Sequence, residues 1–190
     1  MKNAIRMISV LTAIGLISGT ALVFMYSYAN PLIEENRINE TKEAIFKIFP
    51  QAEQYKEQHA GGITVFEVTD KSKKSLGYAF LADGNGYQGT IKMMVGIKLD
   101  LSALVGIEIL ESQETPGLGQ EITKDTFRSQ FIGLVTMPAI TYVKNAKPEK
   151  PGQIQAITGA TVSSSAVINI LNEKIGILRE KLVDTKDVSS

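Results

Sequence analysis

The sequence predicts an α+β fold, in which a single N-terminal transmembrane helix precedes a domain with an antiparallel sheet and flanking helices. Residues 7–28 carry no charge and are long enough to cross a membrane as a helix. Between residues 63 and 111, short runs rich in β-branched residues alternate with glycine-rich breaks, which is typical of strands. From residue 166 to residue 183, apolar residues recur three or four positions apart, which indicates a helix with one apolar face.

The first segment has the length and the flanking charges of a membrane anchor. No charged residue lies between Arg6 and Glu34, and about 20 apolar residues suffice to cross about 30 Å of hydrocarbon. Basic residues precede the segment and acidic residues follow it, so the positive-inside rule places residues 1–6 in the cytoplasm and the rest outside. The rival is a cleaved signal peptide with a cleavage site at Ser27-Tyr28-Ala29. Because a signal peptide has an apolar core of only about 7–15 residues, a retained transmembrane helix over residues 7–29 is favoured.

The stretch that follows is predicted to be a helical linker over residues 30–60. The proline of Asn30-Pro31 is expected to end the transmembrane helix, because the residue before a proline is pushed away from helical geometry. A second helix is predicted for Leu32–Phe49 and is expected to stop at Pro50. The polar residues 51–62 are expected to form a loop.

The domain is expected to span residues 61–185, followed by a short tail at residues 186–190. The runs expected to form its first strands, with turns between them, are Ile63–Thr69, Ser75–Leu81, Thr90–Leu99 and Val105–Glu111. Turns are predicted at Asp83–Gly89 and Leu99–Ser102. A later apolar patch, Pro138–Val143, resembles a strand, and the polar run Lys144–Pro151 is expected to be a loop.

The first candidate binding segment is the loop Glu114-Thr115-Pro116-Gly117-Leu118-Gly119. Pro116 fixes φ and lacks an N–H, and Gly117 and Gly119 allow backbone conformations closed to other residues. The loop can therefore lay main-chain N–H and C=O groups flat against a planar ligand, while Glu114 and Thr115 add side-chain hydrogen bonds. The alternative is an ordinary turn that leads from a strand into a helix predicted for Glu121–Phe131.

The second candidate segment is Ile157–Ser165, where five hydroxyl side chains accompany Gly159 in front of the helix predicted for Ala166–Val183. The first N–H groups of a helix lack intrahelical partners, and the helix dipole is positive there. A glycine also lets the backbone approach a ligand closely. These features predict a phosphate site. The alternative is a plain N-cap, in which the hydroxyls only satisfy the end of the helix.

Composition excludes several classes of function. The 20 basic and 20 acidic residues balance, whereas a nucleic-acid partner requires a basic face. The sequence has no cysteine, which rules out disulfides, iron–sulfur ligation, thiolate catalysis and cysteinyl flavin links. His59 is the single histidine and lies in a polar, glycine-rich turn, so neither a histidine metal centre nor a Ser-His-Asp triad is expected. We therefore expect no metal site and no catalytic side chain.

The two candidate segments together resemble the FMN-binding domain family. Its best-known members are the G subunit of the Rnf electron-transport complex and the C subunit of the sodium-pumping NADH:quinone reductase. Glu114–Gly119 followed by Thr158–Thr161 is similar to the family's pair of motifs in the family's order. Gly86–Ile91 looks like its Gly-Tyr-x-Gly turn, and Val95–Ile97 and the single N-terminal span also fit. The modest length resembles the Rnf subunit more than the quinone-reductase subunit, which is usually longer.

The resemblance implies that FMN is held covalently, by a phosphoester between its phosphate and the hydroxyl of Thr161. In the family this threonine closes an Asp-x-x-(Ser/Thr)-Gly-Ala-Thr signature, which Thr158, Gly159 and Ala160 match. Gln155 stands where the family has the acid, which implies a change in how efficiently a flavin transferase attaches FMN. The family's isoalloxazine contacts fall near residues 114–119 and its phosphate contacts near residues 159–164. The other residues implied to bind the cofactor are Tyr87, Glu114, Thr115, Pro116, Gly117, Leu118, Gly119, Ser163 and Ser164.

The implied function is that of a membrane flavoprotein that relays electrons in an Rnf-type ferredoxin:NAD oxidoreductase, a translocase coupled to Na⁺ or H⁺ movement. Its implied partners are the other membrane and iron–sulfur subunits of that complex and the flavin transferase. The implied location is the inner cell membrane, with the N-terminus cytoplasmic and the FMN-binding domain extracytoplasmic.

Three alternatives remain open. Two keep the flavin: the equivalent subunit of a sodium-pumping NADH:quinone reductase, or a stand-alone FMN electron carrier. The third, from another class, is a membrane-anchored binding module without a cofactor. A hydrolase built on Ser163 or Ser164 would need a lysine base that nothing in the spacing indicates.

Overall fold

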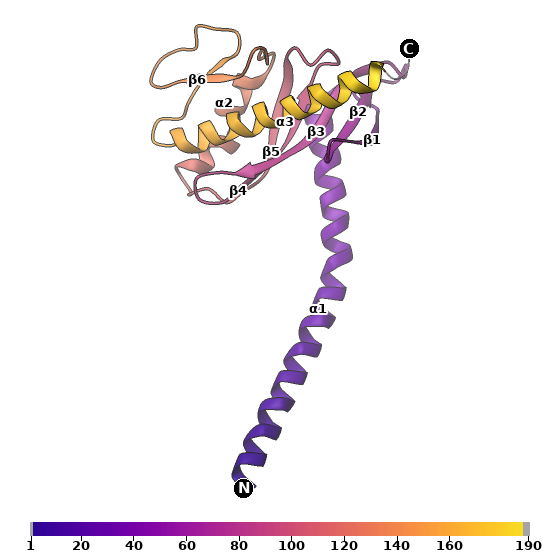
Figure 1. Ribbon diagram of the computed structural model, residues 1–190, viewed down its shortest axis with the longest axis vertical. Coiled ribbons are helices and arrows are strands. Elements are labelled where there is room, and N and C mark those ends of the chain that lie inside the picture. Colours follow the sequence, from indigo (N-terminus) through magenta and orange to yellow (C-terminus); the bar gives the residue numbers. More distant parts are fainter. Residues whose placement is uncertain (1, 188–190) are drawn as a thin grey trace. The chain divides into compact units, whose positions relative to one another are not determined.

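The computed structural model describes residues 2–187 (Figure 1). The chain divides into two compact units, Met1–Thr41 and Lys42–Ser190. The predicted tail at residues 186–190 is described only to Asp187, and Met1 of the predicted cytoplasmic segment also lies outside the described residues. In chain order the elements are α1 (Lys2–Ile48), β1 (Gln54–Ala60), β2 (Ile63–Thr69), β3 (Ser75–Asn85), β4 (Thr90–Ile97), β5 (Leu104–Ser112), the 3₁₀ helix η1 (Gly119–Thr123), α2 (Asp125–Arg128), the 3₁₀ helix η2 (Ser129–Phe131), β6 (Thr141–Val143), β7 (Gln153–Gln155) and α3 (Thr161–Asp187).

The N-terminal helix is longer than the sequence predicted. Within residues 2–187, α1 is the one helix long and apolar enough to cross a membrane. The prediction that the helix ends at Asn30-Pro31 is wrong, because α1 continues through Pro31 to Ile48. A proline removes one backbone hydrogen bond, and a long helix that has already been nucleated can continue past that single loss.

The second unit is built on a five-stranded antiparallel sheet with strand order β1-β2-β3-β4-β5. The predicted α+β fold class is thereby confirmed. The prediction of a loop over residues 51–62 is wrong, because β1 pairs with β2 along its whole length, from Gln54 opposite Thr69 to Ala60 opposite Ile63. The strand escaped prediction because it lies at the edge of the sheet and carries mostly exposed polar side chains.

Both faces of the sheet are buried. Along β3, Ala79 and Phe80 point to opposite faces and both are fully buried. Phe80 belongs to the core formed with α3, which lies across the sheet (Figure 1). Ala79 belongs to a smaller core formed with residues 44–49 at the end of α1. A Cβ at Gly96 would overlap the Ile48 side chain, so the end of α1 packs directly on the sheet backbone.

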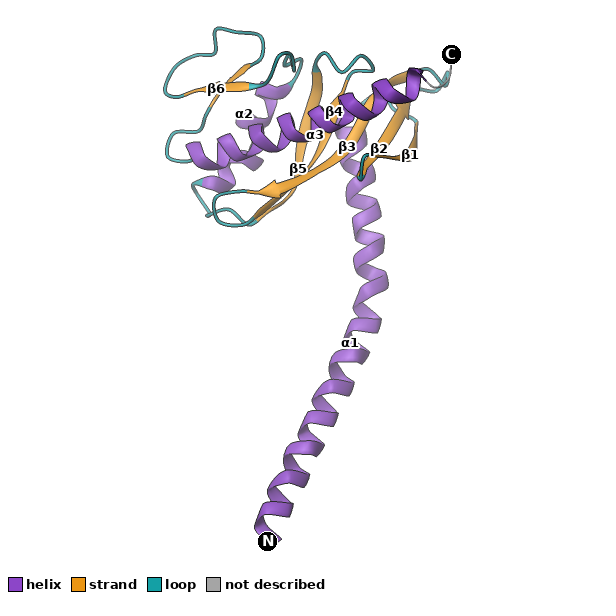
Figure 2. Cartoon of the chain, in the orientation of Figure 1, coloured by secondary structure: helices purple, strands orange, loops and turns teal. Residues whose placement is uncertain are grey.

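The segment between β5 and α3 is mostly loop (Figure 2). The single helix predicted for Glu121–Phe131 is wrong: η1, α2 and η2 occupy this region, and Lys124 has an extended backbone that interrupts them. Within the predicted strand Pro138–Val143, only Thr141–Val143 forms a strand, and it pairs in parallel with β7, which the sequence did not predict. Both strands have only three residues, which is too short for an alternation of apolar and polar residues to be recognised in the sequence.

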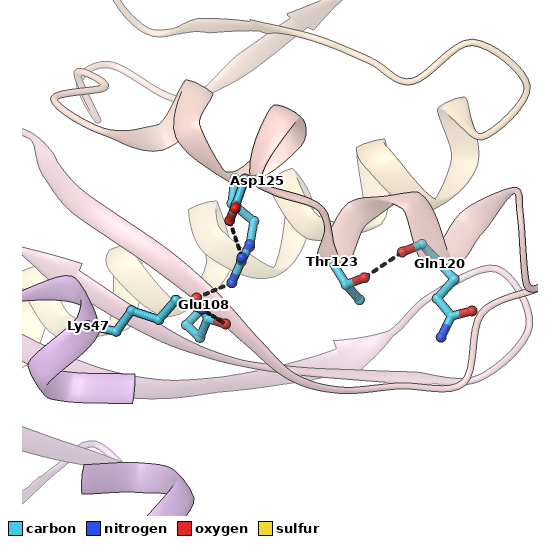
Figure 3. A network of polar contacts seen from close by, with 6 residues as sticks. Lys47, Glu108, Gln120, Thr123 and Asp125 are labelled. Atoms are coloured by element: carbon cyan, nitrogen blue, oxygen red, sulfur yellow. Dashed lines mark hydrogen bonds and ion pairs between the residues drawn. The ribbon is translucent and has the colours of Figure 1, made fainter. Parts of the chain in front are cut away.

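A polar network ties the end of α1 to β5 and α2 (Figure 3). Nζ of Lys47 lies 2.8 Å from Oε1 of Glu108 on β5. Arg128 at the end of α2 pairs with the other oxygen of Glu108 and with Asp125. The side chains of Glu108 and Arg128 are largely buried, so these charges are screened less by salt than a surface pair would be. The network holds α2 against the sheet at Glu108, and β5 continues from there to Ser112.

Candidate functional site

Three segments meet at one end of the sheet. The turn 86–89 joins β3 to β4 at this end. β5 ends at Ser112, which pairs with Ile91 near the start of β4, so the loop of residues 113–118 begins at the same end. α3 starts at Thr161 beside that loop, because its first turn bonds to Glu114. The sheet topology thus brings both candidate segments and the Gly-Tyr-x-Gly turn together.

Glu114 lies at the centre of this meeting point. Its side chain is 4% exposed. Oε1 accepts hydrogen bonds from the main-chain N–H groups of Tyr87, at 2.7 Å, and Gln88, at 3.1 Å. Oε2 accepts a hydrogen bond from the Ser163 hydroxyl at 2.5 Å. One carboxylate therefore links a turn, a loop and a helix.

The hydrogen bonds to Glu114 keep its carboxylate ionised. Burial alone raises the pKa of Glu114, but the hydrogen bonds from the Ser163 hydroxyl and from the N–H groups of residues 87–89 outweigh it, and the pKa is lowered from 4.5. None of the ion pairs between described side chains joins Glu114 to a lysine, arginine or histidine. The charge is therefore stabilised by oriented dipoles at one end of the pocket.

The loop after Glu114 adopts the predicted proline-glycine bend. The N–H groups of Leu118 and Gln120 both donate to the carbonyl of Thr115, at 3.2 and 3.1 Å. Gly117 has φ +74°, a conformation that other residues adopt only with strain. The Thr115 hydroxyl donates to Oε1 of Gln88 at 2.5 Å, which adds a second link to the turn. The bend turns the backbone sharply enough to leave Leu118 exposed beside the pocket.

The start of α3 is held by its own serine. Gly159 has φ +84°, and Ala160 donates its N–H to the carbonyl of Ile157 at 3.0 Å. The Ser164 hydroxyl donates to the carbonyl of Ala160 at 2.9 Å and accepts the N–H of Ile157 at 3.0 Å. Its side chain is fully buried. Ser164 therefore shapes the segment from inside the fold without capping the first N–H groups of α3, so it does not act as the N-cap of the alternative prediction.

Thr161 differs from its neighbours in having a free hydroxyl. Within residues 2–187, the structure shows no hydrogen-bond partner for the Thr161 side chain. In the same part of the chain, the N–H groups of Thr161, Val162 and Ser163 have no acceptor either. These are the donors at the positive end of a helix of 27 residues. The first turn of α3 thus offers one nucleophilic hydroxyl and three N–H donors to an anion.

A pocket of about 460 Å³ lies between these segments. Its exposed apolar side chains are Tyr87, Leu118 and Val162, of which Tyr87 is 71% exposed. The pocket therefore combines an apolar rim, a helix N-terminus and a free hydroxyl. Within residues 2–187, no group of three or more His, Asp or Glu side chains is arranged to hold a metal ion.

The pocket gathers most of the residues predicted to bind the cofactor. Those that line it are Tyr87, Glu114, Thr115, Leu118, Gly119, Gly159, Ala160, Thr161 and Ser163. Pro116, Gly117, Thr158 and Ser164 are outside its lining, and the Thr158 hydroxyl donates to Oδ1 of Asn145 at 3.1 Å instead. Val162 lines the pocket although the sequence did not single it out. The feature of the sequence that could have identified Val162 is an apolar residue in the first turn of a helix, where its side chain is exposed.

Gln155, the departure from the family signature, lies on β7 with an exposed side chain. Its N–H donates to Oε1 of Gln130 at 2.8 Å, and its carbonyl accepts from Nε2 of Gln130 at 3.2 Å. These bonds use only the main chain of Gln155. A different side chain at this position therefore leaves the local backbone bonds intact.

Comparison with known proteins matches the part of the chain that holds these segments. Residues 86–176 match the sequence profile of the FMN-binding domain. The chain is 29% identical over 182 residues to the G subunit of the ion-translocating oxidoreductase complex of Methanosarcina acetivorans, covering 92% of this chain and 94% of that protein. It is also 29% identical to the G subunit of the proton-translocating ferredoxin:NAD(+) oxidoreductase complex of Clostridium ljungdahlii, covering 87% and 86%.

The fold is also similar to that of a solved structure, NqrC of Shewanella oneidensis. The TM-score is 0.57 and the sequences are 26% identical. The similarity covers 60% of this chain and 55% of that one, so the chain matches only about half the length of this structural relative.

Proposed function

We propose that the chain is the membrane-anchored, FMN-carrying subunit of an Rnf-type ferredoxin:NAD oxidoreductase, because residues 86–176 match the sequence profile of the FMN-binding domain. In this proposal the subunit relays electrons within a translocase that moves Na⁺ or H⁺. The observation that carries the proposal is the free hydroxyl of Thr161, which lies with three unpaired N–H groups in the pocket that Glu114 and Leu118 also line. Similarity over most of the chain to the G subunits of such complexes supports the choice of complex.

The residues of the pocket fit FMN. Pockets for ligands of this size usually measure about 300–1,000 Å³, and this one measures about 460 Å³. The exposed apolar side chains of Tyr87, Leu118 and Val162 suit an isoalloxazine ring. The unpaired N–H groups at the start of α3 suit a phosphate, which a helix N-terminus stabilises electrostatically.

The proposed covalent link is a phosphoester on Thr161. A new bond forms between Oγ1 and the phosphorus of the FMN half of an activated flavin dinucleotide, the P–O bond to the nucleotide half breaks, and the released nucleotide takes up the hydroxyl proton. The linked product equals FMN plus the chain less one water. The N–H groups of Val162 and Ser163 would hold the phosphate oxygens there. A flavin transferase would catalyse this transfer, because the pocket shows no acid–base pair beside Thr161.

Within the complex, bound FMN supplies one- and two-electron redox chemistry, and this chain's own residues bind and orient it. The exposed rim residues would shield the ring from water, and Glu114 holds the turn of Tyr87 in place. The chain contains no cysteine, so we assign the iron–sulfur clusters to other subunits of the complex. We assign no substrate chemistry to side chains of this subunit.

We propose that residues 7–29 cross the inner cell membrane. The basic residues Lys2 and Arg6 would lie in the cytoplasm, so residues 61–185 would lie outside it, together with β1, which pairs with β2 in the same sheet. A covalent link is useful on that side of a membrane, because FMN released there could not readily be recovered.

A second candidate keeps the flavin and changes the complex. The structural similarity to NqrC supports an equivalent role in a sodium-pumping NADH:quinone reductase. A stand-alone FMN electron carrier would show the same site without partner subunits. Purification of the tagged chain from its native membrane separates these possibilities: ferredoxin-linked iron–sulfur subunits support the Rnf-type complex, quinone-reductase subunits support the second candidate, and neither supports the carrier.

The experiment that tests the covalent site is in-gel flavin fluorescence after expression with a flavin transferase. We expect the denatured wild-type chain to fluoresce, Thr161→Ala to be dark and Thr161→Ser to keep signal, since it keeps a hydroxyl. Ser165→Ala is the matched control, because its hydroxyl donates to the carbonyl of Val162 and does not line the pocket. A fluorescent Thr161→Ala band would contradict the assignment, and a colourless native wild-type protein would favour a cofactor-free binding module.

A further inference from the structure

The carboxylate of Glu114 is enclosed by two glycines. A Cβ at Gly86 would overlap Oε1 of Glu114, and a Cβ at Gly119 would lie 2.5 Å from Oε2. The same Cβ at Gly119 would lie 2.6 Å from Oγ of Ser163. The backbones of the turn and of the loop therefore close around the carboxylate, and a Cβ at either position would have to displace it.

Both oxygens of the enclosed carboxylate accept hydrogen bonds from other segments of the protein. Oε1 binds the N–H groups of Tyr87 and Gln88, and Oε2 binds the Ser163 hydroxyl. Tyr87 and Ser163 both line the pocket. They are separated from Glu114 by 27 and 49 residues of sequence. The spacing between the aromatic rim and the first turn of α3 therefore depends on one side chain.

We propose that Glu114 is a positioning residue, whose buried carboxylate holds the Tyr87 turn and the first turn of α3 together as walls of one cofactor pocket. This inference rests on the proposed FMN site and refines it. Glu114 acts on the cofactor through Tyr87 and Ser163, and its negative charge, which no basic side chain among the described ion pairs offsets, acts on the potential in the pocket.

The test uses the full-length chain in detergent with Thr161→Val, so that FMN binds reversibly and its Kd can be titrated by fluorescence. Adding Glu114→Ala is expected to weaken FMN binding about tenfold, because it leaves two N–H groups and a hydroxyl without their acceptor. Adding Glu114→Gln is expected to restore most of the affinity. Its Oε1 can still accept from the turn, and its Nε2 can donate to the Ser163 hydroxyl. Glu111→Ala, an exposed acid at the end of β5, is the matched control and should leave Kd unchanged.

A second readout separates positioning from plain stability. When Thr161 is kept and FMN is attached to it covalently, the single change Glu114→Gln is expected to raise the midpoint potential of the flavin relative to the wild-type chain. The reason is that removing a nearby negative charge favours reduction. A purely structural role would leave this potential unchanged. If Glu114→Ala prevents folding, the potential of Glu114→Gln and the Kd of Ser163→Ala decide the question, since Ser163→Ala removes one hydrogen bond only and should also weaken binding.

The outcomes distinguish this inference from the proposed function. If Thr161→Val binds FMN and Glu114→Ala binds it equally well, or if Glu114→Gln leaves the potential unchanged, the positioning role is overturned and the FMN site stands. If neither wild type nor Thr161→Val takes up FMN, the proposed function fails and this inference fails with it.

Discussion

The hydroxyl of Ser163 donates a 2.5 Å hydrogen bond to Oε2 of Glu114 and joins the first turn of α3 to the loop after β5. The two residues are 49 positions apart in the sequence. Neither motif alone would form the pocket, because the loop supplies the bend and the helix supplies the free hydroxyl and N–H groups. This contact is therefore where the two motifs become one site.

Glu114→Gln should make the free energy of unfolding depend less on pH under acidic conditions. Although burial opposes it, hydrogen bonding lowers the pKa of Glu114 in the folded chain, so its ionised form contributes stability that is present above the unfolded pKa, about 4.3. That contribution is lost as pH falls through the folded pKa. Urea unfolding from about pH 7 to about pH 3 should show a wild-type advantage that is constant above about pH 5 and narrows below it. Glu111→Gln should keep the wild-type profile, and a Glu114→Gln curve parallel to wild type throughout would contradict the prediction.

Gly119→Ala should destabilise the domain by about 1–3 kcal/mol. The added methyl would lie 2.5 Å from Oε2 of Glu114 and 2.6 Å from Oγ of Ser163, so the hydrogen-bonded pair must separate. The matched control is Gly176→Ala in the body of α3, where nothing lies within 4 Å of the new methyl. It should stabilise the chain by about 0.5–1 kcal/mol through the higher helix propensity of alanine. Free energies of unfolding in urea check both signs, and equal effects would refute the packing argument.

Tyr87→Ala should weaken reversible FMN binding about threefold to tenfold in the Thr161→Val chain, because it removes an aromatic wall from the pocket. Stability should hardly change, since the Tyr87 side chain is 71% exposed. Ile132→Ala is the control: this side chain is 69% exposed but does not line the pocket. Fluorescence titration gives Kd and thermal melting gives Tm. Equal losses of affinity in both variants would mean that the rim has no specific role.

Gln155→Asp should raise the fraction of chain that a flavin transferase labels, because it restores the acid of the family signature. The bonds of this residue to Gln130 use the main chain only, so Tm should stay at the wild-type value. Gln155→Asn has the same size as the aspartate and no charge, and it should label like wild type. The ratio of flavin absorbance to protein absorbance measures the fraction. An unchanged ratio for Gln155→Asp would show that the position does not matter to attachment.

The sequence predicted the parts of the fold in which apolar residues recur at a regular spacing. The apolar face of α3 recurs every three to four residues, and strands such as β4 are apolar enough to be recognised alone. β1 has no such signal, because an edge strand with exposed polar side chains owes its place to pairing with β2. The Gly61-Gly62 turn, with both φ values positive, was the local signal for that hairpin.

The site was only partly predictable for a similar reason. The free hydroxyl of Thr161 and the bend at Gly117 follow from short motifs. The partners of Glu114 do not, because they depend on the register that brings the ends of β4 and β5 together. Likewise, periodicity suggested that α3 begins near Ala166, whereas it begins at Thr161, where Ser163 is bonded to Glu114 of a distant loop. Contacts between distant segments decided both points.

The most direct test of the account is the mass of the tryptic peptide that carries Thr161. Prolines follow Lys147 and Lys150, where trypsin does not cut, so the peptide should run from Asn145 to Lys174. After expression with a flavin transferase, we expect this peptide to be heavier by FMN less one water, with the added mass on Thr161 in fragment spectra and no addition in Thr161→Val. An unmodified wild-type peptide, or an addition on Thr158 or a serine instead, would contradict the central claim.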